Sequence, residues 1–178
     1  MMLMDNNKAY VIPFKGLKTG VHQFEYIINK KFFDSYSYDD FIDTDVIVQL
    51  ELNKKSTLLE LDFKIKGTVR VNCDVSGEEF NQPINGKLHI IVKFGEKYNN
   101  DDEVILILPH HEFELDVSQY IYEVIILSTP TKRVHPGVVD GTLKTDVLKK
   151  LEEFKNKKEE TTDPRWDELK KLLTDKNP

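Results

Sequence analysis

Residues 116 to 136 of the chain, DVSQYIYEVIILSTPTKRVHP, hold its most continuously apolar run, and Glu123 is the single charge inside that run. Asp116 can cap a helix, and Gln119 stands three positions later, where a capping box has its second side chain. One helical face would then carry Val117, Tyr120, Ile121, Val124, Ile125 and Ser128. Because residues such as Leu127 make the other faces apolar too, we expect a helix that is buried on most sides.

Pro130 should end this helix, because proline lacks a backbone N–H and its ring clashes with the preceding turn. The β-branched residues of the run would also suit a strand. We favour the helix because the run is longer than most buried strands. The chain before it then reads as sheet, and the chain after it reads as a solvated tail.

Segments of alternating apolar and polar residues precede the helix and predict an antiparallel meander. The expected strands are residues 8–14, 21–28, 45–52, 58–65, 68–72, 80–84, 88–94 and 104–108. Gly67 should break or bulge the sheet between two of them. The aromatic and acidic stretch 32–41 predicts a short helix or turn whose rings cover the open end of the sheet. The expected fold class is α+β, mainly β, with an antiparallel curled sheet or barrel around one buried helix.

The chain changes character after the helix. It becomes locally basic at Lys132, Arg133 and His135. Residues 137–142 read as a loop, residues 146–158 predict an amphipathic helix, and a last helix should begin at Pro164. We therefore divide the chain into a β-rich body, residues 1–136, and a helical C-terminal appendage, residues 137–178.

Charge and cysteine usage narrow the function classes. The net charge is −6. From Asp140 onward ten Lys and Arg balance ten Asp and Glu, so the body carries the whole excess. An acidic body repels a phosphate backbone over a Debye length of about 10 Å, so contact with RNA would need a local basic patch or a protein partner. With one cysteine, no signal peptide and no membrane-length apolar run, we expect a cytoplasmic protein.

The sequence holds no P-loop, no GxGxxG and no GxSxG motif, so we expect no enzyme, no cofactor and no metal. His110 and His111 would point to opposite faces of an extended segment, which favours a solvated loop over a metal site. The acidic residues 101–103 lack the spacing of a calcium loop and read as a solvated turn. Arg70 could lower the pKa of the Cys73 thiol, but no base partner is evident, so we interpret Cys73 as structural.

Two features near the helix have competing interpretations. The basic residues Lys132, Arg133 and His135 could contact phosphate. Alternatively, they could be solvated residues after the helix whose positive charges interact favourably with the negative, C-terminal end of the helix dipole. Glu123 could form an ion pair with Arg133 or Arg70, or it could lie on the single wet stripe of the helix.

Four motifs follow one another along the chain. They are Cys73-Asp74 before a tight turn, YEVIILSTP at 122–130, RVHP at 133–136 and DPRWDEL at 163–169. In this combination the chain resembles the YceD family, the large ribosomal RNA subunit accumulation proteins. The early segment IPFKGL at 12–17 resembles Bacteroidetes-type members. Many members have a Cys-x-x-Cys pair. Here Cys73 keeps the first place and Ser76 stands in the second, so the resemblance does not imply for this chain any metal-binding role that those members have.

The resemblance implies a cytoplasmic, non-enzymatic factor that supports 23S ribosomal RNA accumulation and large-subunit biogenesis by binding. Its expected partner is a ribosomal RNA precursor or a large-subunit assembly particle, reached through protein contacts. Residues that could contact a partner are Lys132, Arg133, His135, Arg165 and Trp166, while Cys73, Glu123 and Pro130 are structural or family motif positions. The alternative is a β-barrel that binds a small ligand or metal in its mouth. A further idea is direct RNA binding through Lys132 and Arg133 together with Lys64 and Lys66, which share the polar face of one strand.

Overall fold

The computed structural model describes residues 9–102 and 104–158. These residues divide into two compact units. The first unit holds the described chain up to Asn72 and from Glu79 to Arg133, and the second holds the turn Cys73–Glu78 and the chain from Val134 onward. The division into a body of residues 1–136 and an appendage of residues 137–178 stays a prediction.

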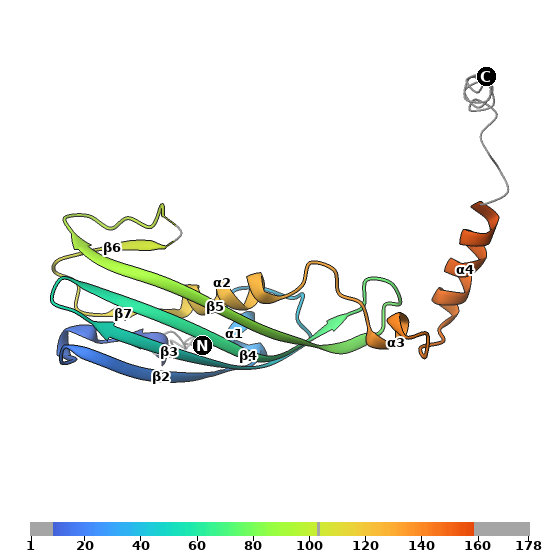
Figure 1. The fold of residues 1–178 in the computed structure, drawn as a ribbon, viewed down its shortest axis with the longest axis horizontal. Coiled ribbons are helices and arrows are strands. Elements are labelled where there is room, and N and C mark those ends of the chain that lie inside the picture. The colour runs from blue at the N-terminus through green and yellow to red at the C-terminus, as the bar shows by residue number, and fades with distance from the viewer. Residues whose placement is uncertain (1–8, 103, 159–178) are drawn as a thin grey trace, which may run out of the picture. The chain divides into compact units, whose positions relative to one another are not determined.

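A five-stranded sheet dominates the first unit (Figure 1). Its strands are β2 (Gly20–Ile28), β3 (Asp43–Lys54), β4 (Leu58–Asn72), β5 (Glu79–Gly95) and β6 (Ile105–Pro109), paired in that order. The first three pairs are antiparallel, and β5 and β6 are parallel. A two-stranded ribbon joins β1 (Val11–Ile12) to β7 (Leu115–Asp116). The mainly β, α+β class is confirmed; the sheet is open rather than a closed barrel, and the last strand is not part of the antiparallel meander.

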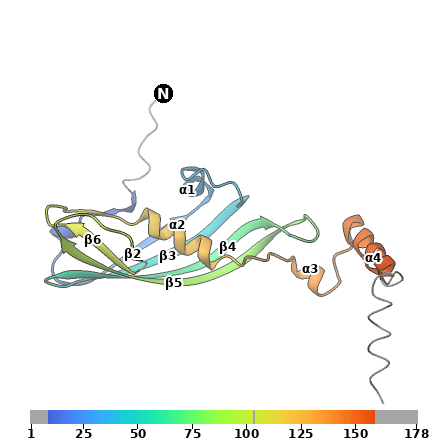
Figure 2. The ribbon, with the colours of Figure 1, turned by 90° about the horizontal axis from the view of Figure 1, so that it is seen from above.

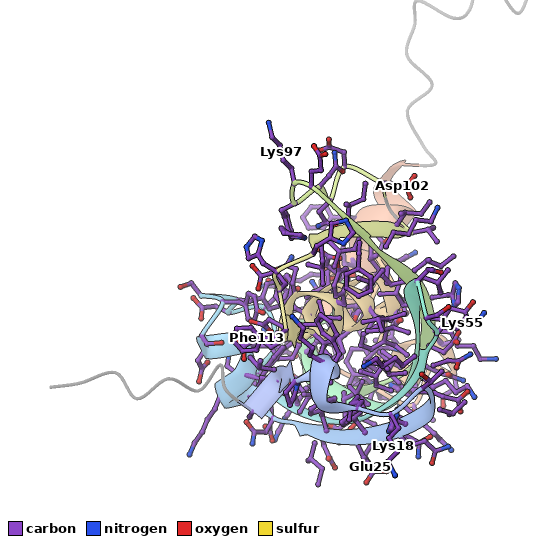
Figure 3. The ribbon with its side chains drawn as sticks, turned by 90° about the vertical axis from the view of Figure 1, so that its left-hand side faces the viewer. Lys18, Glu25, Lys55, Lys97, Asp102 and Phe113 are labelled. Atoms are coloured by element: carbon purple, nitrogen blue, oxygen red, sulfur yellow. The ribbon has the colours of Figure 1, made fainter. Side chains whose placement is uncertain are left out.

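Alternation decides which side of each long strand is buried. The inward residues of β3 and β4 are buried, namely Val46, Val48, Leu50, Leu52, Leu59, Leu61, Phe63 and Ile65. Their neighbours along the strands point to solvent, as period-two geometry requires. Figure 3 shows the sheet curving around the packed side chains, with Glu25 and Lys55 pointing away from them. The predicted faces of these strands are therefore confirmed.

Glycine and proline do not interrupt the two longest strands, contrary to the break or bulge expected at Gly67. Strand β4 passes through Gly67 in unbroken register, and one strand, β5, replaces the two expected at 80–84 and 88–94. Within β5, Pro83 lies where the strand has only β4 beside it, because β6 pairs with residues 91–95 alone. Proline is tolerated in such edge positions because no neighbour needs its missing N–H.

Helix α2 (Ser118–Ser128) packs on the inner face of the sheet against β4 and β5 (Figure 2). It begins after Val117, and the Asp116 side chain accepts a hydrogen bond from the Ser118 N–H at 2.8 Å. Thr129 follows its last residue and precedes Pro130, as expected of a proline stop. The helix is covered by the sheet and by the aromatic rings near α1, and an exposed stripe holds Gln119 and Leu127, of which Leu127 is 82% exposed.

Aromatic rings pack between α2 and the helix α1 (Lys30–Asp34). Phe32, Phe33 and Phe41 are buried, and the Tyr36 ring stacks on the Tyr122 ring with centroids 4.5 Å apart. The aromatic stretch 32–41 is therefore part of the core, as its predicted covering role requires. The first expected strand, residues 8–14, shrinks to β1, and a 3-10 turn, η2 (Phe14–Gly16), follows it.

The second unit holds two helices, α3 (Pro136–Val139) and α4 (Asp146–Lys158). The bounds of α4 are those expected, whereas α3 occupies a stretch predicted as loop. Val147, Leu151 and Phe154 of α4 are between 41% and 67% exposed. Among the described residues, no helix is both long and apolar enough to cross a membrane.

Candidate functional site

The chain that leaves α2 carries two of the predicted contact residues in the first unit. Lys132 is exposed. Arg133 is largely covered, and its guanidinium lies 3.6 Å from the carboxylate of Asp40 in the α1–β3 connection. An ion pair of this kind ties the segment after α2 to that connection. The charge of Arg133 is therefore partly neutralised within the protein, and Lys132 is the more available cation of the two.

His135 lies in the second unit, where its backbone contacts the turn Cys73–Glu78 and its ring contacts the start of α3. Its N–H donates a hydrogen bond to the Cys73 sulfur at 3.2 Å, across 62 residues of sequence. Its ring Nδ1 accepts the Gly137 N–H at 2.9 Å and so caps α3. The ring is then oriented by the start of α3, with Nε2 as its remaining polar atom.

The Cys73 thiol is buried in the turn Cys73–Glu78. Burial raises its pKa, but hydrogen bonds from the His135 N–H, from the Ser76 side chain and from backbone N–H groups of the turn outweigh burial and lower the pKa to about 7. Donors that favour the charged form have this effect on an acid. Arg70 is not the cause, because it pairs with Glu79 at 3.0 Å. The thiol is thus an acceptor at the centre of a hydrogen-bonded turn.

Glu123 lies on the wet stripe of α2. It accepts a hydrogen bond from Gln119, one turn earlier, at 2.7 Å. The alternative partners Arg70 and Arg133 contact Glu79 and Asp40 instead. Pro130 is exposed just beyond the end of the helix. Arg165 and Trp166 lie outside the described residues.

A cavity of about 560 Å³ opens between α2 and β6 in the first unit. Its polar lining consists of three tyrosines, three carboxylates and four neutral polar side chains: Tyr36, Tyr98, Tyr120, Glu112, Glu114, Asp116, Ser35, Asn100, Ser118 and Gln119. The Tyr120 hydroxyl donates to Asn100 at 3.2 Å, and burial first, then nearby Tyr98 and Glu123, raises its pKa to about 12. The cavity could take a small cationic or neutral ligand.

No metal centre can be assembled from the described residues, where no group of three His, Cys, Asp or Glu side chains lies close enough. His111 contacts Glu112 at 3.6 Å on the surface. The Asp102 carboxylate accepts the N–H groups of Val104 and Ile105, which lower its pKa and order the turn before β6. These contacts agree with the interpretation of both segments as surface loops.

Sequence reasoning selected Cys73 and His135 without foreseeing that they meet. The joining hydrogen bond runs from a backbone N–H, which no side-chain pattern reveals. Fold and geometry together define a mainly β protein of the α+β class with an open sheet, whose described candidate contact residues, Lys132, Arg133 and His135, lie in the chain after α2.

The comparison with family models gives the particular family. The model described as "Large ribosomal RNA subunit accumulation protein YceD" matches residues 61–173. The chain belongs to the YceD family. No curated protein and no solved structure matches the chain.

Proposed function

We propose that this protein supports accumulation of 23S ribosomal RNA by binding a large-subunit assembly particle in the cytoplasm, without catalysing a reaction. The observation that carries this proposal is membership of the YceD family over residues 61–173, most of the described sheet and both tail helices α3 and α4. The open sheet supports it, because a broad exposed face suits docking on a large particle better than turnover of a small substrate.

The overall charge of −6 restricts how such a particle is held. A phosphate-rich particle repels an acidic protein at long range, so binding must run through a local basic surface or through a ribosomal protein. The expected contact residues outside the described range, Arg165 and Trp166, would serve the second route. Deletion of residues 163–178 should then weaken particle association and leave the sheet folded; unchanged co-sedimentation would reject this route.

The direct test is affinity purification of the tagged full chain from growing cells, with one half of the lysate treated with nuclease. We expect 23S precursor and a few large-subunit proteins to be enriched in the untreated half. Loss of those proteins on nuclease treatment would mean that RNA holds the complex, and their persistence would mean a protein contact. Absence of ribosomal material from both halves would overturn the proposal.

The cavity beside α2 favours a second candidate, binding of a small ligand. Its tyrosines and carboxylates suit an amine or another cation more than a nucleotide, because three carboxylates would repel phosphate. A thermal-shift screen with divalent metals, polyamines and nucleotides tests this candidate. No stabilisation by any of them would remove it, and stabilisation that Tyr120→Phe and Asp116→Asn both abolish would support it.

A further inference from the structure

Three lysines gather on the outer face of the sheet, the face turned away from α2. Lys64 of β4 lies directly opposite Lys87 of β5, and Lys66 lies opposite Asn85. On the other side of β4, Gln49 and Ile47 of β3 face Lys64 and Lys66. We call Lys64, Lys66 and Lys87 the lysine patch. The side chains of these three strands border an open hollow of about 550 Å³.

The like charges of the lysine patch do not stabilise the sheet. Residues directly opposite in an antiparallel pair have Cβ atoms about 5 Å apart, and like charges there destabilise the sheet. Among the described residues, no carboxylate lies within 4.0 Å of the amino group of any of the three lysines. Three unpaired cations within two strand spacings therefore suit an anionic partner rather than the stability of the sheet.

Three neighbouring carboxylates on the same face have other partners, whereas Glu51 and Asp45 of β3, which lie opposite Asp62 and Thr68, also point outward there. Asp62 contacts the His89 ring at 2.8 Å, Glu60 pairs with Lys55, and Gln49 donates to Glu25. They lie beyond the patch toward the β3–β4 turn and toward β2. An anionic chain would therefore approach the patch from the other side, along the exposed residues Asn85, Pro83 and Asn81 of β5.

We propose that the lysine patch binds the sugar-phosphate backbone of ribosomal RNA. This inference rests on the proposed function, and it names the surface and the partner for it. The lysines supply charge, and the amides of Gln49 and Asn85 supply neutral donors for phosphate and sugar oxygens. No aromatic ring borders the hollow, so bases do not stack there and binding is independent of sequence.

The structure separates this patch from the basic residues after α2. Helix α2 covers the inner face of the sheet, whereas Lys64 and Lys66 point outward. Arg133 is engaged by Asp40. Lys132 and Arg133 therefore do not share a surface with Lys64 and Lys66, and Lys87 completes the patch instead.

Lys87→Glu gives the sharpest test, because it moves folding and RNA binding in opposite directions. It replaces the Lys64–Lys87 repulsion with a cross-strand ion pair, so the midpoint of urea unfolding should rise slightly. The affinity of the full chain for a labelled hairpin from 23S ribosomal RNA should fall by about tenfold or more at low salt. A loss of binding then cannot be attributed to a loss of fold. The matched control is Lys97→Glu on the loop after β5, where Lys97 points into solvent (Figure 3) and the change in net charge is the same.

A triple variant with Lys64, Lys66 and Lys87 changed to Gln measures the number of phosphate contacts. The slope of log affinity against log salt should become shallower by roughly two to three, since each phosphate contact contributes about 0.7 to 0.9. The charge-matched control changes Lys18, Lys31 and Lys97 to Gln, and it should keep the slope. These three lysines are exposed and form no ion pair with any residue that the structure describes. Equal affinity and slope for wild type and triple variant would overturn the proposal.

Other results identify a different occupant or a failure elsewhere. A triple variant that binds RNA normally but loses nuclease-resistant large-subunit proteins would assign the patch to an acidic protein surface and overturn the RNA assignment. A change in oligomeric state with unchanged RNA affinity would assign it to a second copy, with the same consequence. If wild type recovers ribosomal material from cells and the triple variant recovers as much, the patch proposal fails and the proposed function stands. If wild type recovers none, the proposed function fails.

Discussion

Gly67 is the position in the sheet where a single atom would matter most. A Cβ atom there would lie 2.2 Å from the Asp45 carbonyl oxygen, which belongs to the backbone of β3 and cannot rotate away. Gly67→Ala should lower the free energy of unfolding by about 3 kcal/mol or more, because β3 and β4 must separate. Urea unfolding followed by circular dichroism measures the loss. Gly16→Ala, with nothing within 4 Å of the new atom, is the control. A loss no larger than that of the control would contradict the expected clash.

Cys73 should make the stability of the protein depend on pH. The folded pKa is about 7, and the ordinary pKa of the thiol is 9.0. The thiolate is therefore favoured by folding. Its contribution is complete above pH 9, and it is lost as the pH falls from about 9 through about 7. A shift of this size corresponds to about 2 to 3 kcal/mol at most.

The check is the difference in free energy of unfolding between wild type and Cys73→Ser across pH 6 to 10. It should grow between about pH 7 and pH 9 and then level off. Subtracting the variant removes the titration of all other groups. A difference that stays flat, or that shrinks as the pH rises, would show that the backbone donors of His135 and Ser76 do not hold a thiolate.

At the scale of elements, the end of α2 packs on β5 at Gly86, a position without a side chain. A Cβ atom on Gly86 would lie 1.8 Å from the Ser128 hydroxyl oxygen and 2.9 Å from the Ser128 Cβ. Gly86→Ala should lower the free energy of unfolding by about 1 to 3 kcal/mol, because the end of α2 must lift from the sheet. Ser128→Gly alone should cost roughly 0.5 kcal/mol through helix propensity.

The double variant Gly86→Ala with Ser128→Gly separates docking from strand propensity. If the clash is the cause, the double variant should be more stable than Gly86→Ala alone, since the two atoms nearest the new methyl group are gone. Purely additive losses in the same urea titrations would mean that the two residues do not oppose each other.

Elements were predictable from the sequence where side chains decide them. Alternation placed Val46, Val48 and Leu50 inward because burial has the same period as the strand. Prediction failed where the backbone decides. Gly86 falls between the expected strands 80–84 and 88–94, yet it lies inside β5 and under α2. The parallel pairing of β5 with β6 was also hidden, because an alternating pattern carries no strand direction.

For the candidate contact residues, too, the sequence predicted the positions but not the partners. Motif positions pointed to Cys73, Arg133 and His135, but their partners could not be read from the sequence. The Asp40 carboxylate is far from Arg133 along the chain, and the donor to Cys73 is a main-chain N–H. Lys64 and Lys66 were visible on one strand face, whereas Lys87 joins them only through the register of β4 with β5.

At the scale of the whole molecule, removal of α4 and its exposed apolar side chains should separate the stability of the fold from its function. Val147, Leu151 and Phe154 remain at least 41% exposed, so their removal should cost little buried area. A chain ending at Lys144 keeps α3, and with it the hydrogen bonds of His135 to Cys73 and Gly137. We expect its free energy of unfolding to lie within about 0.5 kcal/mol of the full chain in urea titrations.

A chain ending at Thr129 is the control for this truncation. It lacks both the Arg133–Asp40 ion pair and the donor to Cys73, so its free energy of unfolding should be lower by about 1 to 3 kcal/mol. If the chain ending at Lys144 were as unstable as this control, the residues after 144 would contribute to folding. If it is as stable as the full chain, binds the RNA hairpin equally well and yet sediments less with assembly particles, then the sheet contacts RNA and the tail contacts protein. That outcome would explain how a chain with a net charge of −6 is held on a phosphate-rich particle, since neither contact alone has to overcome the repulsion.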